Sequence, residues 1–241
     1  MMDTAFSLLA AFVLAAAMTI YITHSKKNKW RHQQTVIEHL LQLKTVIAFT
    51  QKHRGMCAAY IQGDGKALST LTSINSTLEP IIDKLDGDPF MAQQGRWMGY
   101  LDHWRRLSKQ CTQLDLATSF TQHTNLITNL LYLFEDIAEQ RSFDKKSFKG
   151  TFASAALWQD LPFTAEFIGQ SRAVGVAIVA RGVCTQVDKV KLGYLDTKIA
   201  QLSTKVFNYL ERNGCQQTQL INLAKISCHN FTSLLQKNSL R

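Results

Sequence analysis

Residues 36–61 read VIEHLLQLKTVIAFTQKHRGMCAAYI, and they carry the clearest structural pattern in the chain. Apolar side chains recur along this stretch in alternating steps of four and three residues. That spacing places them on one face of an α-helix, which packs against other helices. Neither glycine nor proline precedes Gly55, so we expect one long helix that ends at the turn formed by residues 63–65. The seam consists of Val36, Leu40, Leu43, Ile47, Thr50, Arg54, Cys57 and Ile61.

The composition agrees with a helical protein. The 241 residues include only 12 glycines and 3 prolines, whereas proteins built from many short strands need turn residues about every ten positions. Nucleotide-binding α/β folds with Gly-rich loops are excluded for the same reason. We therefore predict an all-α fold, with an N-terminal transmembrane helix followed by a helical-bundle domain of seven or eight helices in two packed bundles. After the first helix, further helices are expected at residues 66–86, 89–111, 115–141, 150–159, 162–182, 185–213 and 215–237.

The beginning of the chain predicts a membrane anchor. Residues 4–22 contain no charged side chain, and an apolar helix of about 20 residues crosses the hydrocarbon core. Basic residues follow this run, whereas a secretory signal peptide carries its positive charge before the apolar region. The positive-inside rule then predicts a single-pass protein of the inner (cell) membrane with a cytoplasmic C-terminal domain. We expect an anchor over residues 1–25, a basic juxtamembrane segment over residues 26–35 and a helical domain over residues 36–241.

The cysteine pattern predicts buried free thiols rather than a disulfide framework. The chain has five cysteines, and no two of them form a CxxC pair. Cys228 and His229 are adjacent, but no second pair completes a zinc site. The sequence also shows no recognisable arrangement for nucleophilic catalysis, no paired-carboxylate motif and no HExxH motif. We therefore expect no bound metal, no cofactor and no enzymatic activity.

The net charge of +9, from 27 basic and 18 acidic residues, points to an anionic partner. The basic residues form no stripe with interleaved aromatic residues, which argues against nucleic acid. The simplest interpretation of the positive charge is a basic protein face near a membrane, and the alternative is a site for a small anionic ligand.

Two arginines stand among apolar and small residues. Arg54 lies in the seam described above, and Arg172 lies in a similar seam formed by Leu161, Ala165, Ile168, Arg172, Gly175 and Val179. A guanidinium group stays charged, so its burial without a partner is costly. One interpretation is a small oxyanion held between the two arginine forks, whose geometry suits such ligands. The other is a buried salt bridge, for which the candidate partners are Asp64, Glu135, Asp136 and Glu166.

The segments around both arginines resemble the nitrate- and nitrite-sensing (NIT) domain family. HRGMCAAYIQGDG at residues 53–65 resembles the arginine-containing segment of that family's first helix, and EFIGQSRAVGVAIVARG at residues 166–182 resembles its second half. The resemblance extends over about residues 36–233 in order and spacing. It implies a helical domain of two bundles in which arginines matching Arg54 and Arg172 hold nitrate or nitrite.

The resemblance and the sequence together predict a membrane-anchored cytoplasmic sensor of a small inorganic oxyanion, nitrate or nitrite. Arg54 and Arg172 are the expected ligand-binding residues. His53, beside Arg54, is a weaker candidate that could add a proton-dependent donor, and a helix-surface histidine is the simpler interpretation. The signalling partner is an unknown protein, with a homodimer as one arrangement. The alternative is a ligand-free helical scaffold or adaptor protein at the inner membrane.

Overall fold

The computed structural model describes residues 2–140, 156–212 and 222, and for residues 2–17 it describes the backbone alone. Every regular element in these residues is helical, which confirms the all-α prediction. The α-helices are α1 (Met2–Ile61), α2 (Ala67–Asp86), α3 (Gly95–Gln110), α4 (Leu116–Gln140), α5 (Leu161–Arg181) and α6 (Gln186–Arg212). Short connecting helices are η1 (Met91–Gln93), η2 (Cys111–Gln113) and the π-helical turn η3 (Ala156–Asp160).

Most of the predicted helices lie close to the observed ones. The helix predicted at residues 89–111 begins later, at Gly95. The Asp88 carboxylate accepts hydrogen bonds from the amides of Phe90 and Met91, which stabilises a turn there instead. Part of the helix predicted at 150–159 lies outside the described residues, as does all of 215–237 except residue 222.

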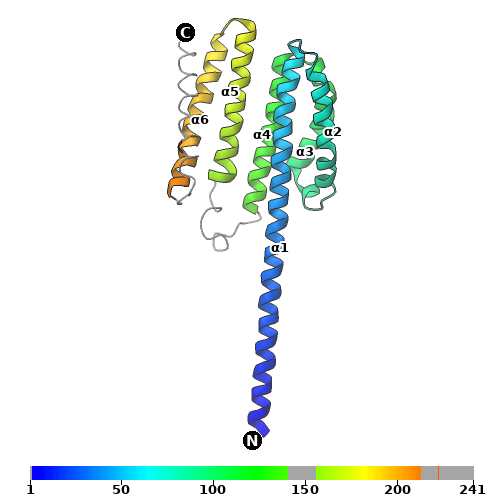
Figure 1. The fold of residues 1–241 in the computed structure, drawn as a ribbon, viewed down its shortest axis with the longest axis vertical. Coiled ribbons are helices and arrows are strands. Elements are labelled where there is room, and N and C mark those ends of the chain that lie inside the picture. Colours follow the sequence, from blue (N-terminus) through cyan, green and yellow to red (C-terminus); the bar gives the residue numbers. More distant parts are fainter. Residues whose placement is uncertain (1, 141–155, 213–221, 223–241) are drawn as a thin grey trace.

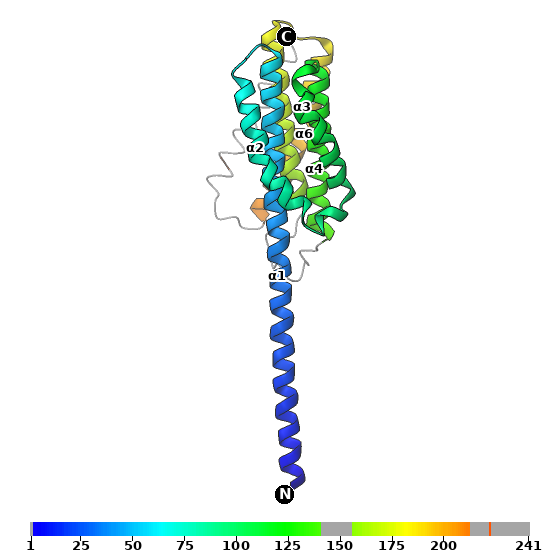
Figure 2. The same cartoon turned by 90° about the vertical axis from the view of Figure 1, so that its right-hand side faces the viewer.

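The N-terminal half of α1 extends away from the other helices, and its C-terminal half packs in the bundle (Figures 1 and 2). In the described part of the chain, no helix combines the length and the apolar character needed to cross a membrane. Most of the anchor predicted over residues 1–25 lies outside the residues whose side chains are described, because side chains are described only from residue 18 onward. The anchor therefore stays a prediction.

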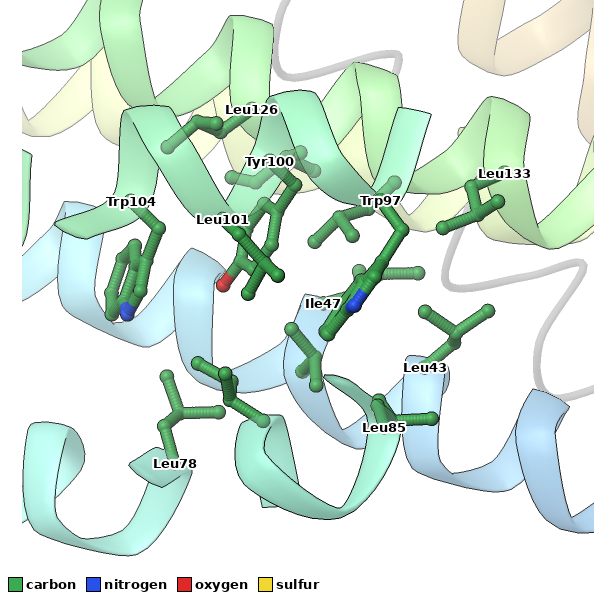
Figure 3. Close-up of a cluster of buried hydrophobic side chains, with 14 of the residues drawn as sticks. Leu43, Ile47, Leu78, Leu85, Trp97, Tyr100, Leu101, Trp104, Leu126 and Leu133 are labelled. Carbon is green, nitrogen blue, oxygen red and sulfur yellow. The ribbon is translucent and has the colours of Figure 1, made fainter. Parts of the chain in front are cut away.

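The core of the bundle lies between α1, α2, α3 and α4 (Figure 3). Trp97 and Tyr100 of α3 are fully buried and stack with 5.5 Å between their ring centroids. The Tyr100 hydroxyl forms a hydrogen bond of 3.1 Å with Thr50, so the polar member of the α1 seam has a partner. The seam itself is confirmed, because all its residues are buried except Ile61, which is half-buried.

Helices α5 and α6 stand side by side at one side of the bundle (Figure 1) and share a small apolar cluster. Val174 of α5 packs there with Leu192 and Ile199 of α6. The seam predicted for α5 is therefore wrong, since Arg172 is exposed and Val179 is 81% exposed. The apolar residues of α5 are distributed around all sides of the helix, so helical periodicity does not identify the face that packs.

Local signals fix the turn between α5 and α6. Gly182 ends α5 in the left-handed conformation, with φ of +67°, which glycine adopts without steric cost. A capping box follows: the Asp188 amide donates to the Thr185 hydroxyl at 3.2 Å, and the Thr185 amide donates to the Asp188 carboxylate at 2.9 Å. These contacts define where α5 ends and α6 begins.

Candidate functional site

A groove of about 680 Å³ lies between α1 and α5. Seven of the sixteen lining residues are glycine or alanine, and their small side chains leave space between the two helices. The small residues are Ala48, Gly55, Ala58 and Ala59 of α1 and Ala165, Gly169 and Ala173 of α5. The charged residues that line the groove are Lys52, Arg54, Arg172 and Asp64. Arg54 is neutralised by a salt bridge to Glu166. Among the described lining residues, the exposed cations Lys52 and Arg172 therefore face the single carboxylate of Asp64, and the groove is weakly electropositive.

The structure places both predicted arginines at this groove, but in different environments. Arg54 is 4% exposed, and its guanidinium forms a two-pronged salt bridge with Glu166 of α5. Nη1 lies 2.5 Å from one carboxylate oxygen, and Nη2 lies 3.2 Å from the other. Nη1 also donates to the Thr124 hydroxyl of α4 at 3.0 Å. Arg54 therefore joins α1, α4 and α5.

The Glu166 carboxylate is fully buried and well supplied with donors. Besides Arg54, the side-chain amide of Gln51 donates to Oε2 and that of Gln170 donates to Oε1, both at 2.9 Å. A buried ion pair keeps its charges only when such hydrogen bonds replace the lost water. Among the partners that the sequence suggested for Arg54, the structure thus selects Glu166.

Arg172 was expected in a buried seam, and this is wrong. Its side chain is exposed and lines the groove on the α5 side. In the described residues, no carboxylate lies within salt-bridge distance of it. The guanidinium of Arg172 is therefore open to an anionic ligand, whereas that of Arg54 already binds a carboxylate.

His53 does not belong to the groove. It is fully buried and faces α3 and α4, because adjacent residues on a helix point about 100° apart. Its Nδ1 lies 2.9 Å from Nε2 of His123, and its ring meets the Trp104 ring edge-on at 4.8 Å. The surface interpretation is therefore wrong for His53. Its role as an anion donor stays a prediction, and His53 is not among the residues that line the groove.

A second cluster surrounds His53. Its Nδ1, the sulfurs of Cys57 and Cys111 and Nε2 of His123 belong to four buried residues whose donor atoms lie within 4.8 Å of one another. The structure joins Cys57 to Cys111 by a disulfide, so the prediction of free thiols is wrong for this pair. Cys184 is a free thiol, as predicted, but it is half-buried rather than buried. Cys215 and Cys228 lie outside the described residues.

The two buried histidines are neutral at neutral pH. Burial lowers the pKa of His53 to about 3, with the neighbouring His123 as a second cause. Burial likewise lowers the pKa of His123 to about 4, and the nearby Arg54 charge adds to this effect. The carbonyl of Ser119 accepts a hydrogen bond from His123 Nδ1 at 2.7 Å, which assigns the ring proton to that nitrogen. The Nε2 lone pair of His123 therefore points toward His53.

Several of these residues were beyond the reach of sequence reasoning. Cys57 and Cys111 are 54 residues apart, and only the packing of η2 against α1 brings them together. The one local signal is the pair His53 and Cys57, whose spacing of four residues puts both on one helix face. Lys52 also has no distinctive context in the sequence.

Family models, curated proteins and solved structures were compared with this chain, and none of them matches it.

Proposed function

We propose that this protein is a helical sensor of a small inorganic oxyanion, nitrate or nitrite, and that the anion binds in the groove between α1 and α5. The observation that carries the proposal is the charge at the groove, where the exposed Lys52 and Arg172 outnumber the one lining carboxylate, Asp64. The third lining cation, Arg54, is neutralised by Glu166. Arg172 supplies an exposed guanidinium fork, and such forks bind oxyanions through paired hydrogen bonds. The groove is much larger than such an anion, so the ligand would occupy only its charged part.

The Arg54–Glu166 pair suggests how binding could change the packing of the helices. A carboxylate is a planar oxyanion, and that of Glu166 meets Arg54 with the two-pronged geometry expected for nitrate. An anion that engages Arg54 must displace Glu166, which would loosen the link between α1 and α5. An anion held by Arg172 and Lys52 alone would leave this link in place. Only in the first case would the helix packing change, and α1 would carry that change toward the N-terminus.

The further parts of the proposal are a single-pass anchor over residues 1–25, a cytoplasmic C-terminal domain and an arrangement in two bundles. They are supported by the uncharged run at residues 4–22, the basic residues after it and the family resemblance of residues 53–65 and 166–182. The unknown signalling partner would read the packing of the helices that carry the arginines.

A ligand-free scaffold or adaptor protein is the second candidate. It is favoured by one observation, the complete satisfaction of the Arg54–Glu166 pair within the protein. A buried arginine with such partners needs no anion, and the pair would then serve only to fix α1 against α5.

Calorimetric titration of the purified protein with nitrate and with nitrite distinguishes these candidates. The sensor requires saturable binding that Arg172→Ala weakens at least tenfold. Arg105→Ala is the matched control, because Arg105 is an exposed arginine of α3 that does not line the groove. Equal heats for the parent and the Arg172→Ala protein would contradict the assignment of Arg172, and the absence of saturable heat in the parent would favour the scaffold.

A further inference from the structure

We propose that the reduced chain binds one Zn²⁺ ion through His53, Cys57, Cys111 and His123. The four residues come from three segments, namely α1, η2 and α4, and all of them are buried. Two imidazole nitrogens and two thiolate sulfurs form a donor set that is typical of tetrahedral structural zinc sites. This proposal rests on the cluster itself and does not depend on anion binding.

The spacing of the donor atoms suits a tetrahedral ion. Zinc–sulfur bonds of about 2.3 Å and zinc–nitrogen bonds of about 2.0–2.1 Å place tetrahedral donors about 3.3–3.8 Å apart. In the structure, Nδ1 of His53 lies 3.7 Å from the Cys57 sulfur and 2.9 Å from Nε2 of His123. Rotation of the side chains by a small amount would bring these atoms to the required separations.

The surroundings of His123 match those of a metal-binding histidine. Its Nδ1 donates to the Ser119 carbonyl, which fixes the ring and leaves Nε2 as the free donor atom. Histidine ligands of metals are commonly held in this way by a second hydrogen bond. Without a metal, the lone pair of Nε2 can only accept the proton of His53 Nδ1.

The disulfide and the zinc site exclude each other, because both need the sulfurs of Cys57 and Cys111. An external dithiol reductant supplies two electrons and two protons, which convert the disulfide into two thiols while the reductant becomes a disulfide. Zn²⁺ binding then releases the two thiol protons and moves the His53 ring proton from Nδ1 to Nε2. Two zinc–sulfur bonds and two zinc–nitrogen bonds form. The oxidised and the zinc-bound chain are therefore alternative states of the same four residues.

Zinc is the ion that this donor set favours. Thiolate and imidazole ligands exclude Mg²⁺ and Ca²⁺, which prefer oxygen, and an enclosed tetrahedral arrangement suits Zn²⁺. All four side chains are at most 1% exposed, so the site is closed to further ligands. Such an ion would hold α1, η2 and α4 together, next to Arg54 on α1.

Cobalt substitution of the full chain tests the proposal. The protein is reduced with a dithiol, freed of metal with a chelator and titrated with Co²⁺, which reports thiolate ligands by a near-ultraviolet charge-transfer band and tetrahedral geometry by intense visible bands. The triple variant Cys184→Ser/Cys215→Ser/Cys228→Ser retains only the two cysteines of the cluster. It should show both signals at one Co²⁺ per chain, and added Zn²⁺ should remove them.

The double variant Cys57→Ser/Cys111→Ser is the counterpart, because serine preserves the shape of both side chains. It should lose the charge-transfer band while circular dichroism shows that its helices remain. A folded triple variant that lacks the charge-transfer band would overturn the proposal. A charge-transfer band that persists in the double variant would overturn it as well. The oxidised triple variant should bind no cobalt through sulfur, and a charge-transfer band in that state would also contradict the assignment.

Discussion

At the scale of single residues, the partners of the charged side chains show which of them are free to bind a ligand. Arg54 and Glu166 satisfy each other within the core, while Arg172 remains exposed at the groove. The sequence identified Arg54 as buried, since it occupies an apolar seam, and named Glu166 among its possible partners. It could not select Glu166, because 112 residues separate the pair and only tertiary packing joins them.

Loss of one partner of this pair should be costly. Glu166→Gln leaves the Arg54 guanidinium buried beside a neutral amide, and we expect the free energy of unfolding to fall by about 3–5 kcal/mol. Asp136→Asn is the matched control, since the Arg96–Asp136 pair lies at the surface with side chains 45% and 40% exposed. That change should cost at most about 1 kcal/mol. Chemical denaturation of both variants measures the difference, and equal losses would contradict this account.

The buried histidines predict a pH dependence of stability. The folded-state pKa values of His53 and His123 are lowered to about 3 and about 4, whereas the unfolded histidine has a pKa of about 6.5. The unfolded chain therefore binds more protons below pH 6.5, and stability falls as the pH falls from there toward the folded values. Each histidine contributes a slope of at most about 1.4 kcal/mol per pH unit.

Urea unfolding of the reduced, chelator-treated protein between pH 7 and pH 5 measures this slope. In the His123→Asn variant only one of the two buried imidazoles is left, so its slope should be smaller. A free energy of unfolding that is the same at both pH values in the parent protein would show that the histidines are solvated in solution.

At the scale of helices, sequence reasoning succeeded where one face of a helix is apolar and failed where the helix is apolar all around. The seam of α1 is observed as predicted, because its large apolar residues lie on one face and pack in the core of the bundle. In α5 the residues around Arg172 offer several apolar faces, and the cluster with α6 selects the one that contains Val174. The groove lies where Ala165, Ile168 and Arg172 of α5 face α1 without filling the space between the two helices.

The start of α6 offers a test at this scale. Thr185→Ala removes the hydroxyl that accepts from the Asp188 amide, and loss of such an N-cap costs about 0.5–2 kcal/mol. Thr204→Ala is the control, since Thr204 is exposed in the interior of the same helix, where alanine is the better helix former. Thermal unfolding should therefore show a lower midpoint for Thr185→Ala only. A similar decrease in both variants would argue against the capping role.

At the scale of the whole molecule, the membrane anchor and the cytoplasmic side of the domain remain predictions from the sequence. The all-α fold followed from composition, because few glycines and prolines are left for strand turns. The positions of the groove and of the cysteine–histidine cluster could not be predicted from composition, because each depends on how distant helices pack. The anchor rests on the uncharged run at residues 4–22 and on the basic residues that follow it.

A topology reporter fused after Arg241 tests the anchor and its direction. The charge pattern predicts membrane-bound protein with a cytoplasmic reporter, because basic residues after the apolar run remain inside. Reporter activity on the outer side of the membrane would contradict the predicted orientation. Deletion of residues 1–25 should release the protein from the membrane, and continued membrane association would show that other residues anchor it.

The central claim is that the groove binds a particular oxyanion, and the thermal unfolding of the purified protein in different salts tests it most directly. A ligand that binds only the folded state stabilises it by about 2.7 kcal/mol at a hundredfold excess over its Kd. For a chain of this size the unfolding midpoint should then rise by roughly 5–10 °C. We expect this rise with nitrate or nitrite but not with chloride at equal ionic strength, and we expect Arg172→Ala to abolish the difference. The same midpoint in all three salts would contradict the claim and leave the groove without an anion.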